Sequence, residues 1–286
     1  VSGSAVTGTN LLATTGIRLA FHARRNQRSC ALVNHRPTEQ GGDCGRCGCS
    51  EGARLAGGTG HHKTTPRLAP SRLAGKHLQR GELMRFILAS RSPGRLNTLQ
   101  RAGIDPEVIV SEFDERLIHD FDPASLAARL ARAKGDSVAD EVEGDAILLA
   151  CDSVLEFDGR VRGKPGSAAS AAKQWYSIRG RQGVLHTGHF VWVRRDAAMS
   201  CSVRVASTTV RFANLDDEEI DAYTASGEPS QVAGGFTIDG LGGAYVTAVE
   251  GDPHNVVGIS LPLIRQILLD LGIHWHTLWR PGIQAP

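Results

Sequence analysis

Apolar side chains at helix or strand spacing, which any folded core requires, become regular in this 286-residue chain only from Met84. Residues 1–83 carry 12 lysines and arginines against 4 acidic residues, whereas the remaining residues carry 20 against 26. The first segment is rich in Gly, Thr, Arg and Ala, and can bury too little apolar surface to offset the entropy lost on ordering. The sequence therefore predicts a disordered basic extension over 1–83, a folded domain over 84–273 and a C-terminal tail over 274–286.

The extension raises two questions of its own. Met84 stands two residues before the first convincing strand, so we expect it to be the natural start, with residues 1–83 arising from a misplaced start codon. Four cysteines of the extension either bind zinc, for which Cys-x-x-Cys spacing is suited, or form an inert tract: Cys30, Cys44, Cys47 and Cys49. The other two cysteines lie in apolar strand patterns and are expected in the core: Cys151 and Cys201.

Strand and helix patterns follow one another from Met84 without strict alternation. Helical spacing and capping residues predict helices at 94–103, 122–142, 167–180, 215–227 and 261–272. Apolar runs and alternation predict strands at 85–90, 108–111, 145–157 and 243–251, and two long strands within 183–213. These two strands form an antiparallel hairpin, and Asp158-Gly159 predicts a second tight turn. We therefore expect an α/β or α+β domain built on a mixed twisted sheet flanked by helices.

The corner Ser90-Arg91-Ser92-Pro93-Gly94-Arg95 joins a strand to a helix and is rich in hydroxyl groups and cations. A helix start offers free backbone N–H groups and the positive end of the helix dipole. Serine hydroxyls can add donors, and Arg95 can fork onto phosphate oxygens. The corner is either an anion cradle or an ordinary helix start, with Ser92 as the cap and Pro93 at the first position.

Three further features are candidates for chemistry. Asp152 follows an apolar run, where carboxylates are rarely buried without a partner; it either holds a metal or activates water, or pairs with a nearby cation at a turn. Lys164 follows the hairpin and is either a phosphate ligand or a solvated surface lysine. The glycine-dense stretch 234–246 has Asp239 in its middle, and either brings backbone close to a ligand or forms a loose hairpin.

Nine short motifs, taken in order, resemble the Maf family of nucleoside triphosphate pyrophosphatases, also known as septum formation inhibitors. They span residues 85–273 and read LASRSPGRLNTL, DER, RLARAK, ACDSV, GKP, HTG, YTASGEP, AGGFTIDGLGG and NVVGISLPL. The resemblance implies two lobes with a deep central cleft. It also implies hydrolysis of a nucleoside triphosphate to the monophosphate and diphosphate with Mg²⁺ or Mn²⁺, and a homodimer.

The resemblance also implies roles for individual residues. Asp152 matches the family's proton acceptor, and Glu115 matches an acidic residue that helps Asp152 hold the metal. Five residues match phosphate-binding positions: Ser90, Ser92, Arg95, Lys134 and Lys164.

The chain departs from the family pattern at three positions that the family links to the choice of base. Gly94 replaces a frequent arginine, Ser153 replaces a frequent threonine, and Asp239 stands where many members have Gln or Glu. The combination matches neither the dTTP/UTP type nor the 7-methyl-GTP type, so the base stays open. The shorter Asp239 suggests a contact with an amino or imino donor, or a bridge through water.

Three functions from different classes follow. The first is an enzyme that removes non-canonical or excess nucleotides. The second is a regulator of cell division that binds a nucleotide without turning it over. The third is nucleic-acid binding through the basic segment 1–83, which we disfavour. The chain has no run of about 18 apolar residues that would predict a membrane span, and its cysteines demand no oxidising compartment, so we expect a cytoplasmic protein.

Overall fold

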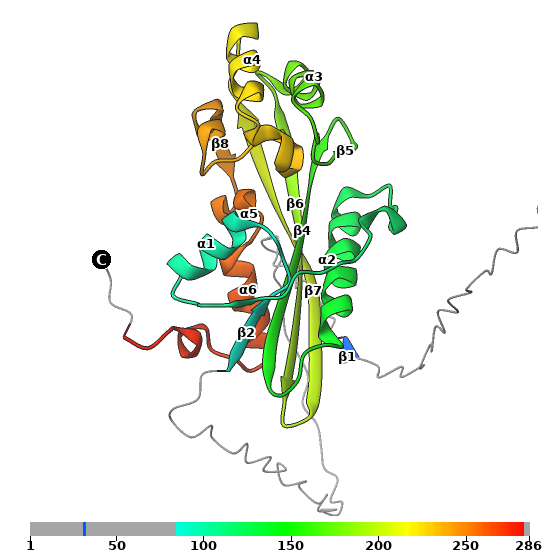
Figure 1. Ribbon diagram of the computed structural model, residues 1–286, viewed down its shortest axis with the longest axis vertical. Helices are drawn as coiled ribbons and strands as arrows, with labels where there is room; N and C mark the ends of the chain where they lie inside the picture. The colour runs from blue at the N-terminus through cyan, green and yellow to red at the C-terminus, as the bar shows by residue number, and fades with distance from the viewer. Residues whose placement is uncertain (1–30, 33–83, 283–286) are drawn as a thin grey trace, which may run out of the picture. The chain divides into compact units, whose positions relative to one another are not determined.

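The computed structural model describes residues 31–32 and 84–282, whose strands form one mixed sheet (Figure 1). Within this part of the chain the order is β1-β7-β6-β4-β2-β3, with β5 beside β4 and β8 beside β7. The pairs β1–β7, β2–β3 and β2–β4 are parallel, and the other pairs are antiparallel. The predicted mixed sheet is confirmed. The strands are β1 (Ala31–Leu32), β2 (Arg85–Leu88), β3 (Glu107–Val108), β4 (Ala146–Phe157), β5 (Arg160–Arg162), β6 (Gln182–Arg195), β7 (Ala198–Phe212) and β8 (Val246–Glu250).

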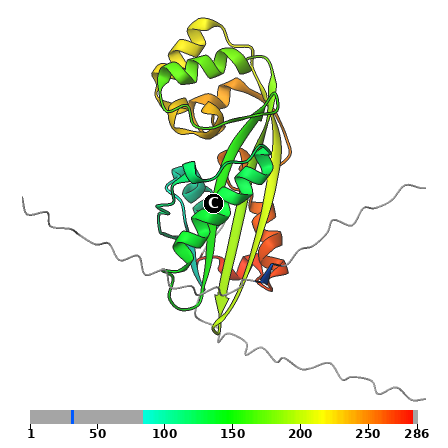
Figure 2. The same ribbon diagram turned by 90° about the vertical axis from the view of Figure 1, so that its right-hand side faces the viewer.

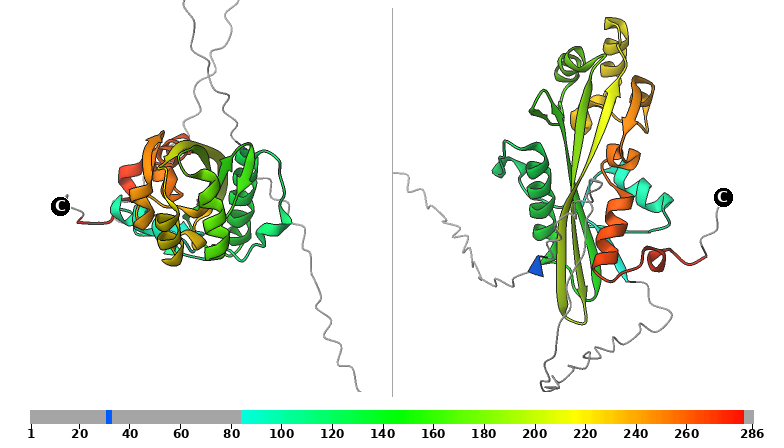
Figure 3. Two further views of the ribbon diagram at one scale, coloured as in Figure 1. Left: turned by 90° about the horizontal axis from the view of Figure 1, so that it is seen from above. Right: turned by 180° about the vertical axis from the view of Figure 1, so that it is seen from behind.

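Helices cover the sheet, and most begin at the capping residues that the sequence contains. Asp122 and Ser92 accept hydrogen bonds from the backbone of the first turn of α2 and α1, and a proline follows each of them. One face of the sheet carries α2, and the opposite face carries α1, α5 and α6 (Figures 1 and 3). The helices are α1 (Pro93–Arg101), α2 (Pro123–Ala139), α3 (Ala168–Ile178), α4 (Asp217–Ala225), α5 (Pro253–Val257) and α6 (Leu261–Asp270). Within the described residues, no helix combines the length and the apolar character needed to cross a membrane.

Two hydrophobic clusters lie along the long strands β4 and β6. The first gathers Ile147, Leu149 and Cys151 of β4 with side chains of α1 and α6. The second gathers Leu155 and Phe157 of β4 with side chains of α3 and α4. Figure 2 shows the long strands passing from one group of helices to the other. Asp152 and Ser153 lie on β4 between the two clusters, so these polar side chains belong to neither hydrophobic core.

A glycine sets how closely α2 approaches the sheet. At Gly188 of β6, a Cβ atom would lie 2.2 Å from the carbonyl oxygen of Ala127 on α2. Only glycine lets the two backbones pack at this distance. The close approach fixes where the side chains of α2 meet β4.

Most predicted elements are present, with corrections at their ends. The strand predicted at 108–111 is only Glu107–Val108, because its partner β2 already ends at Leu88. The short helix α5 was not predicted, although Asp252 caps it and Pro253 occupies its first turn. Asp158 and Gly159 have φ angles of 52° and 67°, as a tight hairpin turn requires.

The two ends of the chain also differ from expectation. The segment predicted as a tail packs against the domain as far as Arg280, because Leu278 is buried in the first cluster and the Arg280 amide donates to the Gly103 carbonyl. Ala31–Leu32, which lie within the segment 1–83 predicted to be disordered, pair with β7 at an edge that β6 leaves open. The rest of that prediction, and the four cysteines of the extension, lie outside the described residues.

Candidate active site

The candidate site lies along a stretch of β4 that lacks a neighbouring strand on one side. β2 pairs with β4 only up to Leu149, and β5 pairs with it only from Leu155. Within the part of the chain that the structure describes, residues 150–154 therefore have no strand partner on this edge. β6 pairs with β4 along the other edge of this stretch. Loops and helix ends can therefore approach the backbone of residues 150–154 only from the edge that has no strand.

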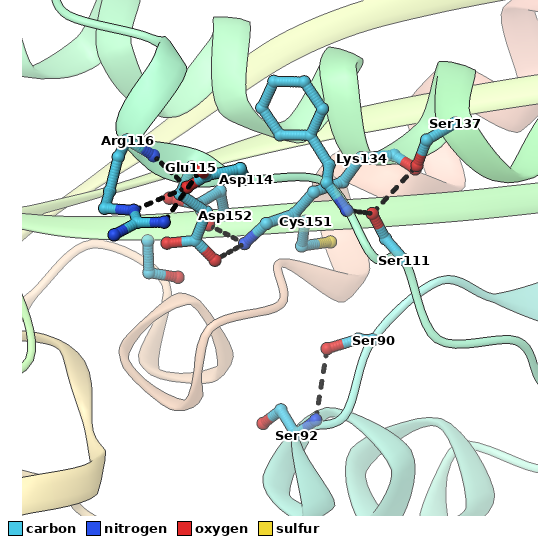
Figure 4. Close-up of polar contacts among 12 residues, drawn as sticks. Ser90, Ser92, Ser111, Asp114, Glu115, Arg116, Lys134, Ser137, Cys151 and Asp152 are labelled. Carbon is cyan, nitrogen blue, oxygen red and sulfur yellow. Dashed lines mark hydrogen bonds and ion pairs between the residues drawn. The ribbon is translucent and has the colours of Figure 1, made fainter. Parts of the chain in front are cut away.

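The predicted corner fills this gap and begins α1. Ser92 caps the helix by accepting from the Arg95 amide at 3.4 Å, and its own amide donates to Ser90 Oγ at 3.2 Å (Figure 4). The helix-start interpretation is thus confirmed. It does not exclude the anion cradle, because the N-terminus of α1 still lies at the open strand edge.

Arg95 binds the protein itself through most of its guanidinium. Its Nε donates to the Gly258 carbonyl at 2.7 Å, and Nη1 donates to the Cys151 carbonyl at 2.8 Å and to Ser90 Oγ at 3.1 Å. Its Nη2 donates to Ser153 Oγ at 3.0 Å. Four of its five N–H groups are therefore used, and Arg95 ties the corner to the open edge of β4 and to the end of α5.

Asp152 faces the opposite side of the sheet, where it meets Lys134 of α2. The Lys134 ammonium contacts Asp152 Oδ1 and also lies 2.6 Å from Glu115 Oε1, so that one cation joins two carboxylates (Figure 4). The Asp152 side chain is 9% exposed and that of Lys134 is 14% exposed, whereas that of Glu115 is 52% exposed. The structure therefore brings together three residues predicted as proton acceptor, metal ligand and phosphate ligand.

The two carboxylates respond differently to this arrangement. Burial raises the pKa of Asp152 above its ordinary value, and the charges of Lys134 and Arg95 act against the rise. Burial would also raise the pKa of Glu115, but the hydrogen bond and charge of Lys134, helped by Lys164 and Arg95, outweigh it and lower that pKa. Lys164 itself is exposed and acts on Glu115 through its charge.

The three positions that the family resemblance links to base choice lie on the α1 side of the sheet. A Cβ atom at Gly94 would lie 3.5 Å from an oxygen of the Asp239 carboxylate and 2.9 Å from a methyl group of Val257. Ser153 Oγ shares a hydrogen bond of 2.9 Å with Thr187 Oγ1, in addition to its bond from Arg95. Gly94 and Asp239 are therefore neighbours, and Arg95 joins their region to Ser153.

Sequence reasoning missed one residue that shapes the glycine-dense stretch. Glu228 accepts from the amides of Leu241 and Gly242, both at 2.9 Å, and from the Tyr223 hydroxyl at 2.9 Å. Its signal was an acid within the YTASGEP motif, which is a weak one. Because of Glu228, the stretch that carries Asp239 is a set of anchored tight turns and not a loose hairpin.

The donor set at Asp152 fits a divalent cation only in part. The described residues contain no group of three or more His, Cys, Asp or Glu side chains that could hold a metal ion. However, Mg²⁺ commonly uses one or two carboxylates and takes its other ligands from water and substrate phosphates. Because a single ammonium touches both, the oxygens of Asp152 and Glu115 are close enough for one cation to bridge.

Comparisons with known proteins find related sequences over most of the described chain. The sequence model of the family described as Maf-like protein matches residues 85–271. A protein of Cutibacterium acnes named nucleoside triphosphate pyrophosphatase is 52% identical over 200 residues, covering 68% of this chain and 94% of the relative. A protein of the same name from Streptomyces avermitilis is 49% identical over 199 residues, covering 69% of this chain and 95% of the relative. Together, the extent of the family match and the coverage of these relatives mean that the chain belongs to the Maf family.

Proposed function

We propose that this protein hydrolyses nucleoside triphosphates to the monophosphate and diphosphate and removes non-canonical or excess nucleotides. Its relatives bear the name of that activity. The observation that carries the proposal is a buried carboxylate, Asp152, at an open strand edge, with Lys134 in contact and Arg95 of α1 bonded to the adjacent Cys151 carbonyl. A group that takes a proton from water has to lie within hydrogen-bond reach of it, and the open edge is where a ligand can approach β4.

The side chains divide the work of the reaction as follows. Asp152 accepts a proton from the water whose oxygen forms a bond to the α-phosphorus, while the bond from that phosphorus to the bridging oxygen breaks and diphosphate leaves. Lys134, Lys164 and the positive end of the α1 helix dipole stabilise the negative charge that grows on the diphosphate. A divalent ion held by Asp152 and Glu115 would supply further positive charge for the phosphate oxygens.

Arg95 has a mainly positioning role in this scheme. Its remaining N–H can meet a phosphate oxygen, while its other four hold Ser90 and the Cys151 carbonyl next to Asp152. This role differs from the expectation that Arg95 forks onto phosphate oxygens.

We assign the choice of base to the region of Gly94, Ser153 and Asp239. When ionised, the Asp239 carboxylate can only accept hydrogen bonds, so it would select a base that presents an amino or imino N–H. Gly94 leaves free the space that a larger side chain would take between α1 and Asp239.

A screen of canonical and modified triphosphates with Mg²⁺ or Mn²⁺, measuring diphosphate and monophosphate together, tests the activity. We expect equal amounts of the two products, and a loss of about 100-fold or more in kcat for Asp152→Asn. Release of single phosphate groups, or no turnover of any triphosphate, would end the proposal. If the protein were instead a regulator without turnover, the Asp152→Asn strain would keep the cellular effect. No observation on the described site favours this alternative.

We also propose that the protein works as a homodimer in the cytoplasm, as the family resemblance implies. Sedimentation of the full chain gives the oligomeric state, and fractionation of cells gives the compartment. A monomer at micromolar concentration, or recovery outside the cytoplasm, would contradict the respective part.

A further inference from the structure

We propose that the Lys134 ammonium occupies the place of the divalent cation between Asp152 and Glu115, and has to leave it before a cation can bind. The inference rests on the proposed function in treating these carboxylates as the metal ligands. It goes beyond that function in giving Lys134 two alternative positions.

The contacts carry the first step. Lys134 Nζ touches the oxygen atoms of both carboxylates, at 2.6 Å in the case of Glu115. A divalent ion held by the same two carboxylates would need the volume that the nitrogen atom fills, because Mg²⁺ sits about 2.0–2.1 Å from its oxygen ligands. Two cations cannot share this volume, and their repulsion is strong where Asp152 is 9% exposed.

The surroundings carry the second step. Lys134 is held on the sheet by α2, and its flexible four-carbon stem lets the ammonium move while the helix stays in place. The exposed side of the pair is Glu115, which is 52% exposed, so the ammonium can swing outward past it. Once displaced, it can neutralise phosphate oxygens of a bound triphosphate.

A functional consequence follows from these two positions. A free divalent ion has to displace Lys134 without offering it a new partner, and should bind weakly. A metal–nucleotide chelate brings both a cation for the carboxylates and phosphate oxygens for the lysine. Lys134 thereby makes the site selective for the chelate over the bare ion.

Binding of Mn²⁺ to the full-length protein in the absence of nucleotide, followed by the electron paramagnetic resonance signal of free Mn²⁺ at about pH 8, tests this. We expect Lys134→Met to bind Mn²⁺ at least about tenfold more tightly than the wild type. Lys134→Arg keeps the cation and should stay as weak as the wild type. If the methionine variant does not fold, Lys134→Gln replaces it and should show the same gain.

Lys164→Met is the matched control, because it removes the same charge near Glu115 from an exposed side chain for which no contact with either carboxylate is found in the described part of the chain. We expect less than about a threefold gain from it, as for a screened charge. Equal gains at both positions would show a general charge effect, and unchanged or weaker Mn²⁺ binding by Lys134→Met would show that Lys134 does not occupy the site; either result overturns the inference. A different outcome separates the two proposals. If Lys134→Met binds Mn²⁺ more tightly but the wild type releases diphosphate from no triphosphate, the proposed function ends and this inference stands.

Discussion

Replacing Arg95 by methionine should destabilise the fold even when no ligand is present. Methionine keeps an unbranched side chain of similar reach and removes all four hydrogen bonds of the guanidinium. Two of the acceptors are hydroxyl groups with other partners, since Ser90 Oγ accepts from the Ser92 amide and Ser153 Oγ bonds to Thr187. The loss therefore concentrates on two backbone carbonyls.

These two carbonyls set the magnitude. The Gly258 and Cys151 oxygens each lose a charged donor, and a polar group left without a partner away from water costs about 1–3 kcal/mol. Arg95 is only half-buried, so water can compensate part of this, and we expect a loss of about 3 kcal/mol. For a domain of this size, that corresponds to a fall in Tm of roughly 6–12 °C.

Urea unfolding of the full-length protein, followed by tryptophan fluorescence, measures the change, and Arg91 provides the control. Arg91 belongs to the same corner, but its side chain is 73% exposed and has one loose ion pair with Glu112 at 3.7 Å. Arg91→Met should change the unfolding free energy by less than about 0.5 kcal/mol. If Arg95→Met were as stable as Arg91→Met and yet inactive, Arg95 would be a phosphate ligand and its role in holding the strand edge would be refuted.

Three further changes are predicted from contacts elsewhere in the domain. The His189 ring is buried, and burial lowers its pKa to about 4, so the ring is neutral. As the pH falls from 6.5 to 4, the unfolded chain binds a proton before the folded chain does, and about 3 kcal/mol of stability should disappear. His189→Gln should flatten this decline when urea unfolding is measured at each pH. Gly188→Ala places a Cβ atom 2.2 Å from the Ala127 carbonyl oxygen and should cost about 2–3 kcal/mol, whereas the open Gly163→Ala should cost less than about 1 kcal/mol in the same assay. Glu228→Gln weakens the acceptor of two backbone amides, so hydrogen exchange over 237–245 should speed up by about tenfold while exchange in β4 stays unchanged.

The order and type of most elements could be predicted because they are encoded locally. Capping residues such as Asp122, followed by proline, set the start of a helix, and Asp158-Gly159 sets a turn. What could not be predicted is where β2 ends relative to β4. That offset of a few residues depends on the register between strands far apart in the chain, and it creates the open edge on which the site lies.

The roles of the two main cations show the same limit. Lys134 belongs to an arginine- and lysine-rich run of a helix, where a lysine is ordinarily solvated. The close packing of α2 on Gly188 places the Lys134 side chain against Asp152, where it is 14% exposed. Arg95 was expected to meet phosphate because a guanidinium can fork onto phosphate oxygens. Its sequence neighbours give no sign that the Cys151 carbonyl lacks a strand partner. In both cases the residue type was informative, and its partner was decided by tertiary contacts.

The open edge of β4 also separates two tasks that adjoin in sequence. Successive side chains of a strand point to opposite faces, so Asp152 meets Lys134 on the α2 side while Ser153 meets Arg95 on the α1 side. A change of residue at Ser153 or Gly94 can therefore alter the α1 side without moving the Asp152 carboxylate. Under the proposed function, the α1 side can vary with the base while the pair of Asp152 and Lys134 is kept.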